Sequence, residues 1–157
     1  MDTITRRSHA THAAAGSGPH HLMLGTVVVS KLLDGDATDG RLALVELRGL
    51  PGSGPGPHLD PWSESFYVLD GELTFQVEQN GTVREIVART GDAVSIPEGI
   101  GHAFSVTGTE PARYLIAGAP AGIETFFADA GEEIETPSIP AGDPPAFDRE
   151  RLLTQID

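Results

Sequence analysis

Four side chains that could bind a metal ion or move protons lie in two short stretches of this chain. His58, Asp60 and Glu64 fall close together, and His102 follows in the second stretch. Two imidazoles and two carboxylates form a plausible ligand set for a divalent metal. The chain contains no cysteine, so nitrogen and oxygen atoms must supply every protein ligand of such a metal. The carboxylate at position 60 makes the set unusual, and much of the functional question depends on it.

The extended segments around these residues could direct their side chains to a common place. Residues i and i+2 of a strand face the same side, so we expect His58 and Asp60 to project together. Pro61 interrupts this extended segment, and Glu64 then enters the next expected strand. His102 opens a later strand. Antiparallel packing of these segments would bring all four side chains into one cavity.

The composition indicates one acidic domain. A chain of 157 residues is long enough to bury a core without disulfide bonds or a structural metal. The 23 Asp and Glu residues outnumber the 10 Lys and Arg residues, which disfavours nucleic acid and anionic membranes as partners. No apolar run approaches the length of a membrane span, and the N-terminus lacks the apolar region of a secretory signal. We therefore expect a cytoplasmic protein.

Short apolar segments separated by glycine and proline predict an all-β sandwich or barrel. The expected strands are Gly25–Leu33, Leu42–Leu50, Glu64–Leu69, Glu72–Gln79, Thr82–Ala88, Ala93–Ile96, His102–Thr107 and Arg113–Gly118. Asn80–Gly81 and Asp70–Gly71 are hairpin signals, because their residues tolerate the positive φ values of tight turns. Asp34–Gly40 and Pro51–Pro57 are expected loops, and Gly122–Ala130 is an expected short helix.

The chain is expected to divide into a barrel with an extension at each end. The division is a flexible N-terminal arm (1–19), a β-barrel domain (20–130) and an acidic, proline-rich C-terminal extension (131–157). Asp148–Ile156 could form a last helical turn or two. Histidines in or beside the arm are expected to be solvated or exposed on the surface: His9, His12, His20 and His21.

A group of large apolar side chains falls in or near the expected barrel. These residues are Trp62, Phe66, Phe75, Phe104, Val106 and Tyr114. Two roles are open for them: packing in the core, or lining a pocket for a hydrophobic substrate. Phe104 and Val106 share the strand face of His102, which would give the expected metal cavity an apolar wall.

The spacing of the two stretches resembles the motifs of the cupin superfamily. The residues that match are His58, Glu64 and Gly71 in the first motif, and Gly91, Pro97, Gly99 and His102 in the second. The resemblance extends over about residues 24–127 and is greatest to small single-domain bacterial cupins of the quercetin-dioxygenase-like type. It implies a double-stranded β-helix (jelly-roll) barrel with short C-terminal helical segments, and by analogy a homodimer. Asp60 replaces the second histidine of the first motif, and Val106 replaces the asparagine of the second.

The resemblance implies a metal held by His58, Glu64 and His102, with position 60 as a fourth ligand. The first three alone resemble the two-histidine, one-carboxylate set of non-haem iron oxygenases. Asp60 could be a fourth ligand that favours a harder ion, or a general acid or base beside the metal. It could also mark a degenerate site that binds no metal. The expected cofactor is a divalent transition metal (Fe, Mn, Ni, Co or Zn), or none in a degenerate site.

These inferences predict a metal-dependent enzyme that acts on a small, largely apolar organic substrate. Dioxygenase-like chemistry is the leading reaction class, with Glu64 and Asp60 as the catalytic carboxylates. The first alternative is a non-oxidative isomerase, cyclase or lyase of natural-product biosynthesis, which would use acid–base chemistry by Asp60, Glu64 and His102. The second alternative is a cupin that binds a small molecule without turnover. Neither a nucleic acid nor a membrane is expected as a partner.

Overall fold

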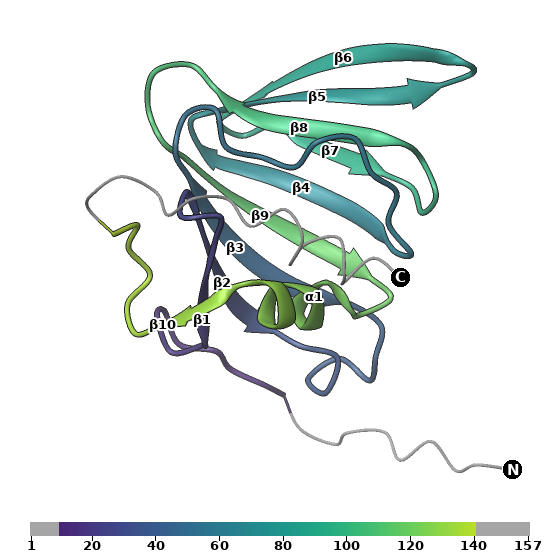
Figure 1. Ribbon diagram of the computed structural model, residues 1–157. Coiled ribbons are helices and arrows are strands. Elements are labelled where there is room, and N and C mark those ends of the chain that lie inside the picture. The colour runs from purple at the N-terminus through teal and green to yellow at the C-terminus, as the bar shows by residue number, and fades with distance from the viewer. Residues whose placement is uncertain (1–9, 141–157) are drawn as a thin grey trace, which may run out of the picture.

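The computed structural model describes residues 10–140, which form two antiparallel sheets and one helix (Figure 1). The elements are β1 (His20–Met23), β2 (Val27–Leu33), β3 (Ala43–Gly49), β4 (Ser63–Asp70), β5 (Glu72–Gln79), β6 (Thr82–Arg89), β7 (Ala93–Ile96), β8 (His102–Thr107), β9 (Ala112–Ala119), α1 (Ile123–Ala130) and β10 (Glu132–Ile134). The expected helical turn at Asp148–Ile156 and the expected solvation of His9 fall outside the described residues.

The sheets form two layers with the core between them. The large sheet has the strand order β10-β1-β2-β3-β9-β4-β7, and the small sheet has the order β6-β5-β8. The small sheet lies over β4 and β9, and α1 covers the other part of the large sheet near β1 and β3 (Figure 1). This arrangement confirms the all-β jelly-roll fold with a short helical segment.

The strands follow the alternation of the sequence. In β3, Ala43, Val45 and Leu47 are buried, and the residues between them are only half-buried. Such alternation is the pattern of a strand with one face on the core. The β5–β6 hairpin turns at Asn80 (φ 53°) and Gly81 (φ 77°), so both residues have the positive φ values of a primed turn. All eight expected strands and the expected helix are present, with their ends shifted by at most two residues.

An aromatic cluster fills the space between the sheets. The ring of Phe66 lies 4.9 Å from that of Phe75 and 5.1 Å from that of Phe104, and Tyr114 lies 6.0 Å from Phe104. Phe66, Phe75 and Tyr114 are at most 1% exposed. Edge-to-face contacts of this kind add to the stabilisation that burial provides. These rings therefore pack in the core, and their proposed role in a substrate pocket stays a prediction.

The structure corrects the prediction for His20. This residue lies inside β1, a strand that the sequence did not indicate, and it is 3% exposed. Its Nδ1 lies 2.8 Å from Oγ of Ser30 on β2, and its Nε2 lies 3.3 Å from the carbonyl oxygen of Gly16. Residues before β1 thus return to cover the ring. His21 is half-buried, whereas His12 is exposed as expected.

The last strand lies beyond the expected end of the barrel domain. In β10, Glu132 and Ile134 pair with Leu22 and His20 of β1, so the large sheet continues past residue 130. The three-part division of the chain stays a prediction, but a boundary at 130 would separate two paired strands. Within residues 10–140, none of the helices is long and apolar enough to cross a membrane.

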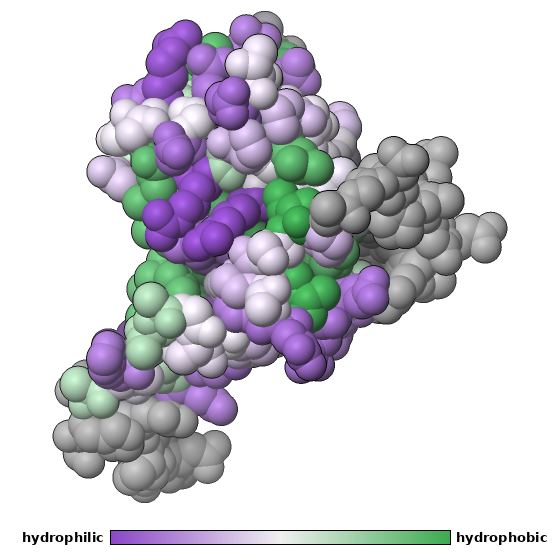
Figure 2. Space-filling view, turned by 90° about the vertical axis from the view of Figure 1, so that its left-hand side faces the viewer, coloured by the Kyte–Doolittle hydropathy of each residue, from purple (hydrophilic) through white to green (hydrophobic). Residues whose placement is uncertain are grey.

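Charged residues on the outer surface pair with one another. Arg113 donates two hydrogen bonds to Glu46, at 3.0 and 2.9 Å, and Arg48 donates one to the same carboxylate at 3.2 Å. Arg89 forms an ion pair with Glu72 at 3.2 Å. Figure 2 shows strongly hydrophilic residues across the narrow middle of one face, between smaller hydrophobic areas.

Candidate metal centre

His58 and His102 meet through a short backbone bridge. The amide nitrogen of His58 donates to the carbonyl oxygen of His102 at 3.0 Å, and the reverse bond measures 3.1 Å. Directly opposed residues of an antiparallel pair place their side chains on the same face. The centroids of the two imidazole rings accordingly lie 4.3 Å apart. The bridge brings together two residues that are far apart in sequence.

The two carboxylates approach the imidazole rings from the same side of the barrel. Oδ2 of Asp60 lies 3.2 Å from Nε2 of His58 and 3.4 Å from Nε2 of His102. Oε2 of Glu64, on β4, lies 3.3 Å from Nε2 of His102. One ligand atom each from His58, Asp60 and His102 lies within 4.8 Å of the others, and Glu64 adjoins this group through His102. All four predicted residues are therefore close together.

Both histidines are held in the orientation that a metal ligand needs. Nδ1 of His58 lies 2.7 Å from the carbonyl oxygen of Gly56, and Nδ1 of His102 lies 2.9 Å from that of Ile100. A carbonyl oxygen can only accept a hydrogen bond, so each Nδ1 carries the proton. In the neutral ring, the lone pair is then on Nε2 and points at the carboxylates.

Three atoms at the centre of the cluster lack a hydrogen-bond partner. These atoms are Oδ2 of Asp60, Oε2 of Glu64 and Nε2 of His102, and all three are buried. Burying polar atoms unpaired is costly, and such exceptions call for an explanation. Metal–ligand bonds of about 2.1 Å place neighbouring ligand atoms roughly 3.0 to 3.4 Å apart in octahedral or tetrahedral geometry. The three distances from Asp60 and Glu64 to the imidazole nitrogens lie in this range, so these contacts fit a divalent metal.

Trp62 orients the carboxylate of Glu64. The indole Nε1 donates to Oε1 of Glu64 at 3.3 Å, which leaves Oε2 directed at His102. The indole also packs against Gly122, at the start of α1, where a Cβ atom would lie 3.2 Å from the ring. Phe126 of α1 lies 6.5 Å from it, centroid to centroid. The sequence indicated Trp62 only as a core or pocket residue, because spacing alone does not show which way an indole points.

Backbone hydrogen bonds fix the loops that carry the cluster. The amide nitrogen of Gly99 donates to the carbonyl oxygen of Asp60 at 3.2 Å, and that of Glu98 donates to Oγ of Ser63 at 3.0 Å. The two stretches recognised in the sequence are thus joined by direct hydrogen bonds. Gly56 and Ile100, which orient the histidines, each precede their histidine by two residues. Their role uses backbone atoms, so their side-chain types gave no signal.

The surrounding charges change the pKa values of both histidines in the same direction. Burial lowers the pKa of His58, but the nearby carboxylate of Asp60 and the contact with Gly56 outweigh it and raise the pKa above its usual value. Burial likewise lowers the pKa of His102, and the contacts with Glu64 and Ile100 more than offset it. Both rings therefore lie in a strongly cation-attracting environment. A proton and a metal ion compete for the same Nε2 atoms.

Solvent reaches the cluster mainly at His58 and Asp60. The side chains of His58 and Asp60 are 26% and 14% exposed, whereas those of His102 and Glu64 are 2% and 6% exposed. A ligand must therefore approach past His58 and Asp60.

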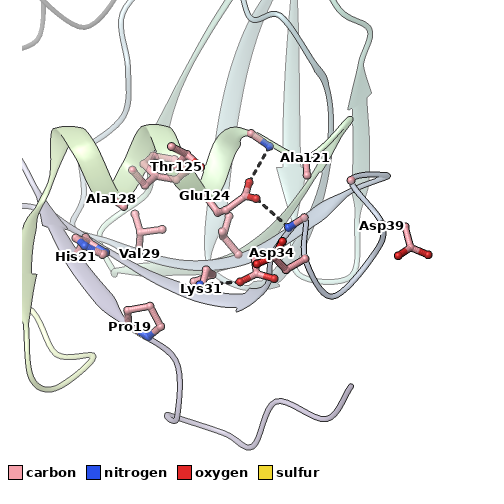
Figure 3. Close-up of a pocket in the computed structure, with 16 residues that line it drawn as sticks. Pro19, His21, Val29, Lys31, Asp34, Asp39, Ala121, Glu124, Thr125 and Ala128 are labelled. Atoms are coloured by element: carbon pink, nitrogen blue, oxygen red, sulfur yellow. Dashed lines mark hydrogen bonds and ion pairs between the residues drawn. The ribbon is translucent and has the colours of Figure 1, made fainter. Parts of the chain in front are cut away.

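A cavity of larger volume lies elsewhere in the described structure. It has a volume of about 710 Å³ and is enclosed by α1, β1, β2 and the loop at 34–40 (Figure 3). Some of its charged groups are paired: Glu124 accepts hydrogen bonds from the amides of Gly35 and Gly122, and Lys31 contacts Asp34 at 2.9 Å. A second cavity, of about 430 Å³, lies against β5 and β8 and includes Phe104 but no residue of the cluster. The unpaired ligand atoms, rather than cavity size, mark the candidate metal site.

Comparison with known families agrees with the fold and with the motif spacing. Residues 46–118 match the family model for the cupin domain. The chain carries a cupin domain. The matched part of the cupin domain runs from β3 to β9, and it includes His58, Asp60, Glu64 and His102.

Solved structures similar to this cupin domain include oxalate decarboxylases. A variant of the Bacillus subtilis enzyme gives a TM-score of 0.64 at 17% identity, covering 77% of this chain and 32% of that chain. A structure described for the Mn(II) centres of the same enzyme gives 0.63 at 17% identity, with the same coverage. This chain thus spans about a third of those proteins, and likeness at this identity shows the fold alone. No curated protein matches the sequence.

Proposed function

We propose that this protein is a divalent-metal-dependent enzyme that acts on a small, largely apolar organic molecule by dioxygenase-like chemistry. The convergence of Oδ2 of Asp60, Oε2 of Glu64 and Nε2 of His102, all buried and unpaired, is the observation that carries the metal assignment. The Mn(II) centres of the similar Bacillus subtilis oxalate decarboxylase support a metal in this type of barrel. The protein is also proposed to form a homodimer.

The residues of the cluster have distinct roles in this proposal. Bound here, a divalent transition metal would supply Lewis acidity toward a substrate oxygen and, in the case of iron or manganese, electron transfer. His58, His102 and Glu64 hold it, and the carbonyl oxygens behind the two rings keep Nε2 directed inward. Asp60 lies on the solvent-accessible side, where it either completes the ligand set or accepts a proton from an enol or hydroxyl group.

Metal analysis of protein purified without chelator is the first test. We expect about one equivalent of metal per chain, and a large loss of metal in His102→Ala. Ser65→Ala, an exposed change on the outer face of β4, is the matched control. Protein that contains no metal and takes up none on addition of Mn²⁺, Fe²⁺, Ni²⁺, Co²⁺ or Zn²⁺ would rule out the proposal.

Oxygen uptake tests the reaction class. Metal-loaded protein should consume dioxygen with at least one diketone- or flavonol-like compound, and Glu64→Gln should abolish the uptake. Substrate conversion without oxygen uptake would contradict dioxygenase-like chemistry. Ligand binding without any conversion, in wild type and Glu64→Gln alike, would instead indicate a binding protein.

Non-oxidative proton transfer is a second candidate, favoured by the position of Asp60. Its Oδ2 lies within 3.4 Å of both imidazoles, as an acid–base pair requires. An isomerase, cyclase or lyase of this type would exchange a substrate C–H proton with solvent under anaerobic conditions. Loss of that exchange in Asp60→Asn, with metal content unchanged, would support it. Exchange that persists in Asp60→Asn would exclude Asp60 as the base.

A further inference from the structure

We propose that Asp60 makes this metal centre electrically neutral, and that the centre therefore prefers neutral or singly charged oxygen ligands and rejects dianions such as oxalate. This inference rests on the metal site proposed above and specifies its substrate class. It concerns the charge that the protein presents to a ligand, which the fold alone does not determine.

The charge of the centre follows from the hydrogen bonds of its residues. Because Nδ1 of His58 and of His102 donates to a backbone carbonyl, both rings can bind a metal through Nε2 in the neutral form. Asp60 and Glu64 bind as carboxylates and contribute two negative charges. These charges cancel the two positive charges of a divalent ion. A histidine at position 60, as in the family motif, would leave one positive charge uncompensated.

The described part of the chain brings no lysine or arginine into the cluster. Its ion pairs join only the two histidines to Asp60 and Glu64. The other ion pairs lie elsewhere: Lys31 with Asp34 at the cavity under α1, Arg48 and Arg113 with Glu46, and Arg89 with Glu72. A bound dianion would therefore meet a centre whose metal charge is already balanced by two carboxylates, and no cationic side chain would compensate the added charge.

Burial strengthens this discrimination. The side chains of Glu64 and Asp60 are 6% and 14% exposed, so water screens their charges poorly. Asp60 also lies on the side from which a ligand enters, and its charge acts on the ligand before contact. The formal charge of the whole chain, −13, disfavours approach of anions in the same sense.

These conditions define a substrate class. The ligand should reach the centre as an uncharged molecule with a carbonyl, enol or hydroxyl oxygen, and lose at most one proton on binding. Hydroxyketones and diketones meet this description, and dicarboxylates do not. The Bacillus subtilis relatives are oxalate decarboxylases by name. This chain would share their fold and differ in the charge of its preferred ligand.

The test compares a dianion with a monoanion on the same Mn²⁺-loaded protein. Oxalate and acetylacetone, which binds as its enolate, would be titrated into wild type, Asp60→Asn and Asp60→His while the Mn²⁺ electron paramagnetic resonance spectrum is followed. Each variant removes one negative charge, and Asp60→His also restores a nitrogen ligand. Metal content is measured first, so that a failure of metal binding is recognised separately.

We expect the affinity for oxalate to rise on the order of tenfold or more in both variants, and that for acetylacetone to rise by less. An equal change for the two ligands, or oxalate binding to wild type as tightly as to the variants, would overturn the inference while leaving the metal site intact. If neither variant retains Mn²⁺, the wild type decides by itself: tighter binding of oxalate than of acetylacetone would overturn the inference. Wild type that binds no metal would overturn both the inference and the proposed function.

Discussion

The indole of Trp62 binds one oxygen of the Glu64 carboxylate and leaves the other facing His102. Nε1 of Trp62 donates to Oε1 at 3.3 Å, and Oε2 lies 3.3 Å from Nε2 of His102. One oxygen is therefore fixed by the protein, and the other is free for a cation. Hydrogen bonds to metal-binding carboxylates commonly set the orientation and affinity of the site.

Replacing Trp62 by phenylalanine should weaken metal binding. Trp62→Phe keeps an aromatic ring near Gly122 but removes the donor to Glu64, so we expect a loss of about tenfold in Mn²⁺ affinity. Competition with a metal-sensitive chelator would measure it. Phe126→Leu, which alters the ring contact with Trp62 but not the donor, should change the affinity much less. Equal losses in both variants would show that packing, rather than the hydrogen bond, is responsible.

Metal binding should stabilise the fold. A cation would satisfy the unpaired atoms of Asp60, Glu64 and His102 in the folded chain only. At a free Mn²⁺ concentration of about one hundred times the dissociation constant, the free energy of unfolding should rise by about 2.7 kcal/mol. Urea denaturation with and without Mn²⁺ measures this change. His102→Ala should show no such increase, and an increase of equal size would place the binding site elsewhere.

The buried contact between His20 and Ser30 should contribute to stability. Ser30→Ala removes the hydroxyl that lies 2.8 Å from Nδ1 of His20 and leaves that buried nitrogen without its partner. We expect the free energy of unfolding to fall by about 1–2 kcal/mol in chemical denaturation. The matched change Ser65→Ala affects an exposed serine pair, with oxygens 3.4 Å apart, and should have little effect. Equal effects would contradict a special role for the β1–β2 contact.

Glu46 should make stability depend on pH in the acid range. Its hydrogen bond with Arg113, and less so that with Arg48, lowers its pKa below the usual 4.5, although burial opposes this. A group with a lowered pKa in the folded state stabilises the protein above the unfolded pKa and loses that contribution as the pH falls through the folded pKa.

The test of Glu46 is the pH dependence of a charge-removing variant. At pH 7, Glu46→Gln should lower the free energy of unfolding by about 1 kcal/mol, a modest value because Arg113 is half exposed. The difference from wild type should shrink as the pH falls below 4.5. Glu85→Gln, an exposed change on β6, is the control. A difference that stays constant over this range would contradict the assignment.

Much of the barrel could be predicted because its strands are short apolar segments separated by glycine and proline. Asn80 and Gly81 marked the β5–β6 hairpin, and β3 shows the expected alternation. The placing of His58 and His102 in one site was predictable from their spacing, since it matched a known motif. The two backbone hydrogen bonds between these residues hold their side chains in one site.

Other features depend on tertiary contacts that local sequence does not encode. Strand β1 is only four residues long, and β10 (Glu132–Ile134) is mostly acidic, so neither shows a strand pattern. The two strands pair with each other although they are distant in sequence, and β1 also pairs with the adjacent strand β2. The burial of His20 follows from the same pairing. The bond between Trp62 and Glu64 depends on a side-chain conformation, which residue spacing does not specify.

The pairing of β10 with β1 protects the sheet from association with other molecules through an open strand edge. β10 covers one edge of β1, and β2 covers the other. Removal of the residues after Ala130 would uncover a row of backbone amide and carbonyl groups along His20–Met23. Uncovered strand edges accept strands from other molecules and promote aggregation. The three residues of β10 thus act as a protective cover for a sheet whose candidate metal-binding strand, β4, lies several strands away.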